Sequence, residues 1–131
     1  MSKVAYLDSS FLLGILFQEA SWQKLQKKLE AFDYVVSTRL MEAEVRSALK
    51  REDLEQADFD GLVTGLDWIQ PNDELGEPLK QIFDHGYLRG ADAYHLAAAL
   101  WLVGDLAKDC TFLSLDQQQS VIAKKLGFAV N

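Results

Sequence analysis

Apolar residues follow two different spacings along this chain. Short apolar runs, typical of buried strands, occupy 3–8, 34–37 and 110–116, and shorter ones stand at 68–70 and 128–130. Between these runs, apolar residues recur every three or four positions, which predicts amphipathic helices. The expected helices span 9–17, 21–32, 38–51, 53–66, 74–85, 91–103 and 117–126. Short strands that alternate with helices in this way predict an α/β fold, with one parallel sheet and helices on both of its faces.

Capping residues set the expected helix starts. Ser9 and Ser10 offer side-chain oxygens to the first helix, and Asp53 with Gln56 three positions later resembles a capping box for the fourth. The helix at 91–103 is rich in alanine and apolar on nearly every side, which indicates a buried central helix.

Length and composition indicate one folded domain that covers residues 1–131. With 49% hydrophobic and 25% charged residues, a chain of 131 residues has enough apolar side chains for a single core. No apolar run approaches the length of a membrane span and no leader segment is evident, so we expect a cytoplasmic protein. Cys110 is the only cysteine, which excludes an intramolecular disulfide, and we expect it to be buried.

Charge is distributed unevenly along the chain. The net charge of −7 argues against a general nucleic-acid coat. Residues 24–51 nevertheless carry seven basic side chains against four acidic ones, whereas residues 52–77 carry nine acidic side chains and no basic one. A basic face beside an acidic lobe is compatible with local binding of a phosphate backbone or of an oppositely charged protein, and equally with two solvated faces.

Four carboxylates occupy positions where an uncompensated charge is unfavourable. Asp8 and Asp116 each end an apolar strand, and Glu44 and Asp92 each stand in the apolar stripe of a predicted helix. Ligands of parallel sheets gather at the carboxyl ends of strands. Acids drawn together from distant segments are neutralised best by a divalent cation. Because two histidines and one cysteine do not supply a usual zinc site, oxygen ligands favour Mg²⁺ or Mn²⁺.

For the first two acids there are competing interpretations. Asp8 precedes a helix and is a possible cap, but the serines that follow it already offer cap oxygens, which favours a ligand role. Glu44 falls inside the apolar stripe of its helix, whereas Glu42 borders Arg46 four residues on and favours a solvated ion pair. The alternative for Glu44 is a buried hydrogen-bond partner.

The other two acids lie at helix starts, where structural roles compete with metal binding. The helix dipole favours a carboxylate in the first turn, so both interpretations of Asp92 stay open. His95, one turn on, is either a catalytic base or, as is more common, a packed histidine. Asp116 and Gln119 form an Asp-x-x-Gln capping arrangement, which is compatible with a metal contact. We expect Arg89 to pair with a carboxylate rather than to contact phosphate.

Four segments of the chain together resemble the PIN-domain family, and most closely its VapC-type toxin branch. The segments are Tyr-Leu-Asp-Ser-Ser at 6–10, Glu-Val-Arg-Ser-Ala-Leu at 44–49, Leu-Arg-Gly-Ala-Asp-Ala-Tyr-His-Leu-Ala at 88–97 and Phe-Leu-Ser-Leu-Asp at 112–116. Ser114 stands where that branch more often has threonine. The resemblance covers nearly the whole chain, with the segments in the right order.

This resemblance implies a five-stranded parallel sheet and a Mg²⁺- or Mn²⁺-dependent endoribonuclease. Its catalytic and metal-binding residues would be Asp8, Glu44, Asp92 and Asp116. An RNA substrate, a homodimer and an inhibiting antitoxin, as in a type II toxin–antitoxin pair, are implied as well.

The sequence also bears on a partner surface and on two alternative functions. The apolar helices at 11–17 and 22–32 are candidates for a groove that binds an antitoxin helix, although the same pattern is common in cores. A catalytically silent PIN-fold interaction module is the alternative function, yet such a module would not need to keep all four acids. An aspartyl-phosphate phosphatase is disfavoured, because Ser10 stands where it would carry a second aspartate.

Overall fold

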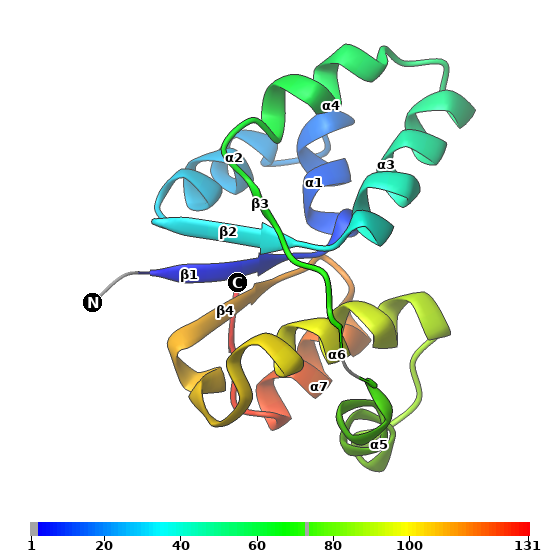
Figure 1. Ribbon diagram of the computed structural model, residues 1–131. Coiled ribbons are helices and arrows are strands. Elements are labelled where there is room, and N and C mark those ends of the chain that lie inside the picture. Colours follow the sequence, from blue (N-terminus) through cyan, green and yellow to red (C-terminus); the bar gives the residue numbers. More distant parts are fainter. Residues whose placement is uncertain (1–2, 73) are drawn as a thin grey trace.

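A computed structural model describes residues 3–72 and 74–131 (Figure 1). The strands are β1 (Val4–Leu7), β2 (Tyr34–Ser37), β3 (Asp67–Trp68), β4 (Cys110–Leu113) and β5 (Ala129–Val130). The α-helices are α1 (Ser9–Leu16), α2 (Trp22–Glu30), α3 (Arg39–Arg51), α4 (Gln56–Leu62), α5 (Gly76–His85), α6 (Gly90–Val103) and α7 (Gln117–Lys125). A 3₁₀ helix, η1 (Gly104–Asp109), leads into β4.

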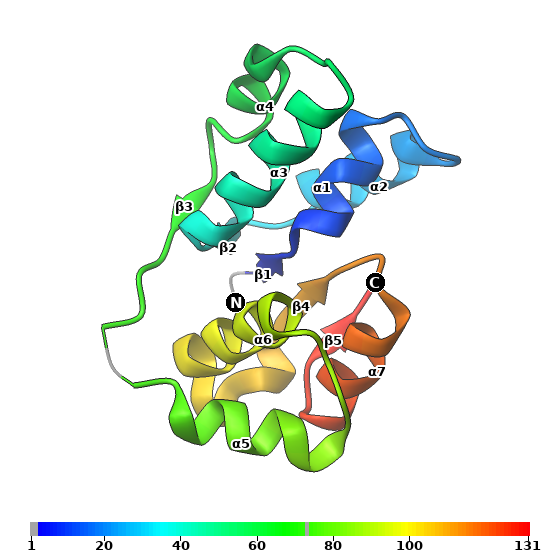
Figure 2. The same cartoon turned by 90° about the vertical axis from the view of Figure 1, so that its right-hand side faces the viewer.

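The five strands form one sheet in the order β3-β2-β1-β4-β5, and every neighbouring pair is parallel. This confirms the predicted fold class. The chain runs outward from β1 on both sides, so the strand order reverses between β1 and β4. Parallel α/β sheets bind ligands outside the carboxyl ends of the strands at such a reversal. Figure 2 looks onto these carboxyl ends.

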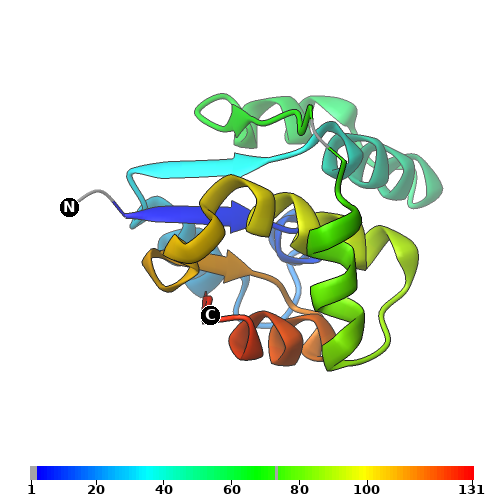
Figure 3. The ribbon, with the colours of Figure 1, turned by 60° about the horizontal axis from the view of Figure 1, so that its bottom comes forward.

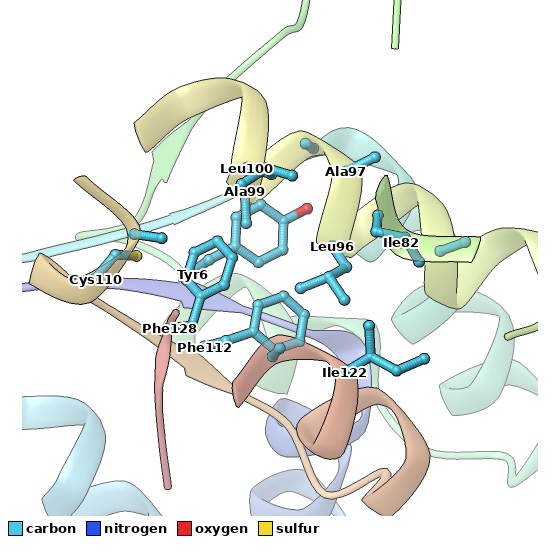
Figure 4. Packing of buried hydrophobic residues seen from close by; sticks show 14 of the residues in the cluster. Tyr6, Ile82, Leu96, Ala97, Ala99, Leu100, Cys110, Phe112, Ile122 and Phe128 are labelled. Atoms are coloured by element: carbon cyan, nitrogen blue, oxygen red, sulfur yellow. The ribbon is translucent and has the colours of Figure 1, made fainter. Parts of the chain in front are cut away.

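Helices cover both faces of the sheet. Helices α1 to α4 lie on one face and α5 to α7 on the other (Figure 1). Because side chains alternate along a strand, Ala5 and Leu7 join the core under α1 and α3, whereas Tyr6 points into the opposite core. There the Tyr6 ring stacks on Phe112, beside Leu96 of α6 (Figure 4).

The alanine-rich helix α6 is the buried central helix, as predicted. Ala93, Ala97, Ala98 and Ala99 are all buried, and their small side chains let the helix lie close against the sheet. No helix in the described ranges is long and apolar enough to cross a membrane.

The predicted capping box at Asp53 is wrong. Asp53 adopts a left-handed conformation (φ +55°), and its N–H donates to the carbonyl oxygen of Lys50 as α3 ends. Asp53 therefore lies in the turn that ends α3 and not at the start of the next helix, since α4 begins after Glu55. Gln56 instead binds Arg46, and α4 ends at Leu62, four residues earlier than expected.

Ion pairs neutralise part of the basic stretch at residues 24–51. Arg46 reaches both Glu42 on its own helix (2.9 Å) and Asp60 on α4 (2.7 Å). Arg39 pairs with Glu42 as well, and Arg51 pairs with Glu52. The arginines of the basic stretch are thus neutralised by neighbouring acids, which favours the solvated-face interpretation.

Candidate active site

Asp8 lies at the carboxyl end of β1 and is only 2% exposed. It is the N-cap of α1, because its Oδ2 accepts hydrogen bonds from the Ser10 backbone N–H (3.0 Å) and from the Ser10 hydroxyl (2.6 Å). The expectation that Ser9 or Ser10 caps this helix is wrong, since both residues already belong to its first turn. The cap uses Oδ2 of Asp8 and leaves Oδ1 for other contacts.

Gln119 holds that second oxygen. Its Nε2 donates to Asp8 Oδ1 (3.1 Å) and to the backbone carbonyl of Asp92 (3.0 Å), while its Oε1 accepts from the Ser114 hydroxyl (2.6 Å). The residue is fully buried on α7. One neutral side chain therefore joins the ends of β1 and β4 to the start of α6. The sequence identified Gln119 only as a capping partner and gave no signal for this role.

Glu44 on α3 contacts the buried His95 on α6, although its side chain is 28% exposed and is thus no more buried than that of Glu42 (26%). His95 Nε2 lies 2.5 Å from Glu44 Oε1 and 4.0 Å from Asp8 Oδ1, so two of the predicted acids flank one buried imidazole. Glu42 makes the expected surface pair with Arg46. Asp8, which follows β1, and Glu44, in the middle of α3, thus approach the same imidazole nitrogen.

The orientation of the His95 ring follows from its two hydrogen bonds. A carboxylate can only accept, so in the neutral imidazole Nε2 carries the proton toward Glu44. Nδ1 then accepts from the Tyr6 hydroxyl at 2.8 Å. Burial raises the pKa of Tyr6 well above its usual range, which keeps that hydroxyl protonated as the donor. His95 is therefore a packed histidine, and it also contacts a predicted site residue.

Asp92 lies in the first turn of α6 and pairs with Arg89 (3.1 Å), which confirms the predicted role of that arginine. Burial is the main cause that raises the pKa of Asp92, and the Asp8 and Asp116 carboxylates raise it further, against the lowering effect of Arg89. Asp116 caps α7 as predicted, with Oδ1 accepting from the Gln119 N–H (2.8 Å). The raised pKa of Asp92 is thus mainly an effect of burial, to which the Asp8 and Asp116 carboxylates add.

The four carboxylates offer oxygen ligands, which suit a hard cation, but they are not already arranged as a metal site. Within residues 3–72 and 74–131, no three His, Cys, Asp or Glu side chains form a ready-made metal cluster. Glu44 and Asp92 are each bound to a nitrogen of a neighbouring side chain. Carboxylate oxygens nevertheless suit Mg²⁺ or Mn²⁺, and a cation would offset both the burial of the Asp92 carboxylate and its repulsion by Asp8 and Asp116.

The fold and the site together define a parallel α/β protein in which Asp8 and Glu44 flank one buried imidazole near the point where the strand order reverses. The PIN domain family model matches residues 5–125, and the chain belongs to this family. A chain from the crystal structure of VapBC2 from Rickettsia felis bound to a DNA fragment from their promoter has a similar fold. The TM-score is 0.65 with 11% identity, over 98% of this chain and 97% of that one. No curated protein matches this sequence.

Proposed function

We propose that this PIN-domain protein is an endoribonuclease that hydrolyses RNA phosphodiester bonds with the help of Mg²⁺ or Mn²⁺. The observation that carries the proposal is the convergence at one imidazole. His95 Nε2 lies within 4.0 Å of acids from β1 and α3. Gln119 then links the first of these acids, Asp8, to the start of α6, which bears Asp92.

In this proposal Asp8, Glu44 and Asp92 hold the cation directly or through water, and Asp116 completes the site. A bound divalent cation lowers the pKa of its water and stabilises charge on phosphoryl oxygens. The side chains around these acids hold the carboxylates in position. Gln119 fixes Asp8 from one side and the helix cap fixes it from the other, so its carboxylate is held in position. His95 restrains Glu44 in the same way.

The decisive experiment compares wild type with Asp8→Asn on single-stranded RNA, in manganese and in chelator. Wild type should cleave only with the metal, and the variant should not cleave. Asparagine is as good an N-cap as aspartate, so the variant should remain folded, which thermal unfolding checks. Asp105→Asn is the matched control, because Asp105 is exposed in η1, at the opposite end of the sheet. Full activity of Asp8→Asn would refute the assignment.

A catalytically silent interaction module is the second candidate, and one observation favours it. Glu44 and Asp92 already have nitrogen partners, as they would in a structural network without metal. Such a module predicts identical RNA profiles with manganese and with chelator. Metal-dependent cleavage that is lost in Asp8→Asn would exclude it.

We also propose that the protein is the toxin of a type II toxin–antitoxin pair and forms a homodimer. Support comes from the family and from the fold shared with the VapBC2 complex. The expected antitoxin groove needs one correction, because Phe11, Leu12 and Ile15 of α1 are buried in the core. The remaining candidate is a hollow of about 270 Å³ between α2 and α4, lined in part by Leu29 and Leu66.

The partner proposal is tested in the genome and in solution. An adjacent small open reading frame is expected. Its product should copurify with this chain and inhibit RNA cleavage. Failure of the two proteins to form a complex would remove the toxin–antitoxin assignment while leaving the nuclease proposal in place.

A further inference from the structure

A hollow of about 230 Å³ opens between α7 and the segment that joins α5 to α6. Figures 2 and 3 show α7 beside the end of α5, from which this segment continues. The first wall is His85, Gly86 and Tyr87, and the second is formed by α7. The α7 residues in it are Gln117, Gln118, Val121, Ile122 and Lys125.

Each wall of the hollow is close in sequence to a residue of the candidate active site. Gln117 directly follows Asp116, the acid that caps α7. Tyr87 stands two residues before Arg89, which binds Asp92. The chain therefore runs directly from each wall of the hollow to a residue of the candidate site, which is the geometric basis for relating the two.

Tyr87 is the most exposed large side chain of the hollow, since the residue is 74% exposed. A large apolar ring held in water at the edge of a concave site is typical of a recognition surface. Val121 on the facing wall is also exposed, and the buried Ile122 forms part of the floor. The hollow thus has an apolar centre with an open aromatic face.

The polar groups around this centre match the parts of a nucleotide. The amides of Gln117 and Gln118 each carry donors and an acceptor, which suits the hydrogen-bonding edge of a base. Lys125 supplies a cation for phosphate, and α7 carries two lysines and no acid between Gln117 and Lys125. An exposed aromatic ring stacks on any unpaired base.

We propose that this hollow is a subsite for one unpaired base of a single-stranded RNA, stacked on Tyr87 beside the phosphate to be cleaved. The proposal rests on the proposed nuclease function and adds to it a position for one base, at Tyr87. Duplex RNA is excluded from such a subsite, because paired bases have their faces stacked on one another.

Binding is measured in the Asp8→Asn background with manganese, so that the RNA stays intact, using a fluorescent single-stranded oligoribonucleotide of roughly eight nucleotides. Tyr87→Ala should raise the Kd by about fivefold or more, since stacking on an aromatic residue accounts for an effect of that size per base. Tyr87→Phe keeps the ring and should retain nearly full affinity. Tyr34→Ala is the matched control, because Tyr34 is 51% exposed but lies where β2 begins, at the far end of the sheet.

Turnover gives a second readout. Tyr87→Ala in the otherwise unchanged enzyme should raise KM and leave kcat nearly unaltered, which a general loss of folding would not do. Unchanged Kd and KM in Tyr87→Ala would overturn the subsite, as would an equal loss in Tyr34→Ala or in Tyr87→Phe. Dependence of duplex binding on Tyr87 would overturn it too, because it would indicate a general electrostatic or protein-contact surface.

The two proposals fail separately. If wild type does not cleave RNA but the oligonucleotide still binds through Tyr87, the subsite stands and the hydrolytic function is wrong. If wild type cleaves RNA and Tyr87→Ala binds and cleaves equally well, the function stands and the subsite is wrong.

Discussion

Replacing Gln119 with leucine should destabilise the fold strongly, because this side chain is fully buried although its helix, α7, faces solvent. Leucine removes three hydrogen bonds, to Asp8, to Ser114 and to the Asp92 carbonyl. The bond to the Asp8 carboxylate is charge-assisted and is worth about 1.5–3 kcal/mol, while the neutral ones add about 0.5–1.5 kcal/mol each. Because Asp8 keeps its two bonds to Ser10, the expected net loss is about 2–4 kcal/mol.

Urea unfolding followed by circular dichroism measures this loss, and for a chain of this size the Tm should fall by roughly 10 °C. Gln81→Leu is the matched control, since Gln81 is exposed on α5 and its replacement should change stability by less than about 0.5 kcal/mol. If Gln119→Leu were as stable as the control, the three hydrogen bonds would contribute nothing net, and the account of Gln119 as the organiser of the site would be refuted. RNA cleavage by the folded variant should also fall, because Asp8 loses one of its restraints.

Three further predictions concern single groups. Tyr6→Phe deprives His95 Nδ1 of its donor in a fully buried place and should cost about 1–3 kcal/mol in urea unfolding, whereas Tyr34→Phe on the surface should be neutral. The pKa of Asp92 is raised above its ordinary 3.8, so its contribution to stability is full below that pH and is lost as the pH rises through the raised pKa. The stability of Asp92→Asn relative to wild type should therefore increase from about pH 3 to pH 7 without metal, and a constant difference would contradict this sign. Burial raises the pKa of Cys110 to about 11, so a thiol reagent at neutral pH should modify it only after unfolding, and rapid reaction of the native protein would contradict its burial.

The spacing of apolar residues was sufficient to predict the order and type of the elements. The runs at β1, β2 and β4 are short and bounded by helical periodicity, and the alanine-rich pattern of α6 identified the most buried helix. Boundaries were less accurate. Asp53 and Gln56 have the spacing of a capping box. Asp53 nevertheless lies in the left-handed turn that ends α3, so it does not stand at the N-cap of α4.

The site was predictable as a set of acids but not as a set of contacts. The helical wheel paired Glu42 with Arg46 correctly, but its division into a surface Glu42 and an inward Glu44 is wrong, because the two side chains are almost equally exposed (26% and 28%). It contained no information on the partner of Glu44, since His95 lies fifty-one residues away along the chain. Gln119 was visible only through its local spacing to Asp116.

Periodicity and chemistry along the chain determined the alternation of strands and helices, the buried position of α6 and the choice of Asp8, Glu44, Asp92 and Asp116 as candidates. These properties depend on neighbours within a few residues, which a sequence records directly. The tertiary structure alone decided that β1 lies between β2 and β4, that one imidazole lies between two acids, and that a buried glutamine joins β1, β4 and α6. These contacts join residues far apart in the chain, and the packing of the two cores against the sheet brings them together.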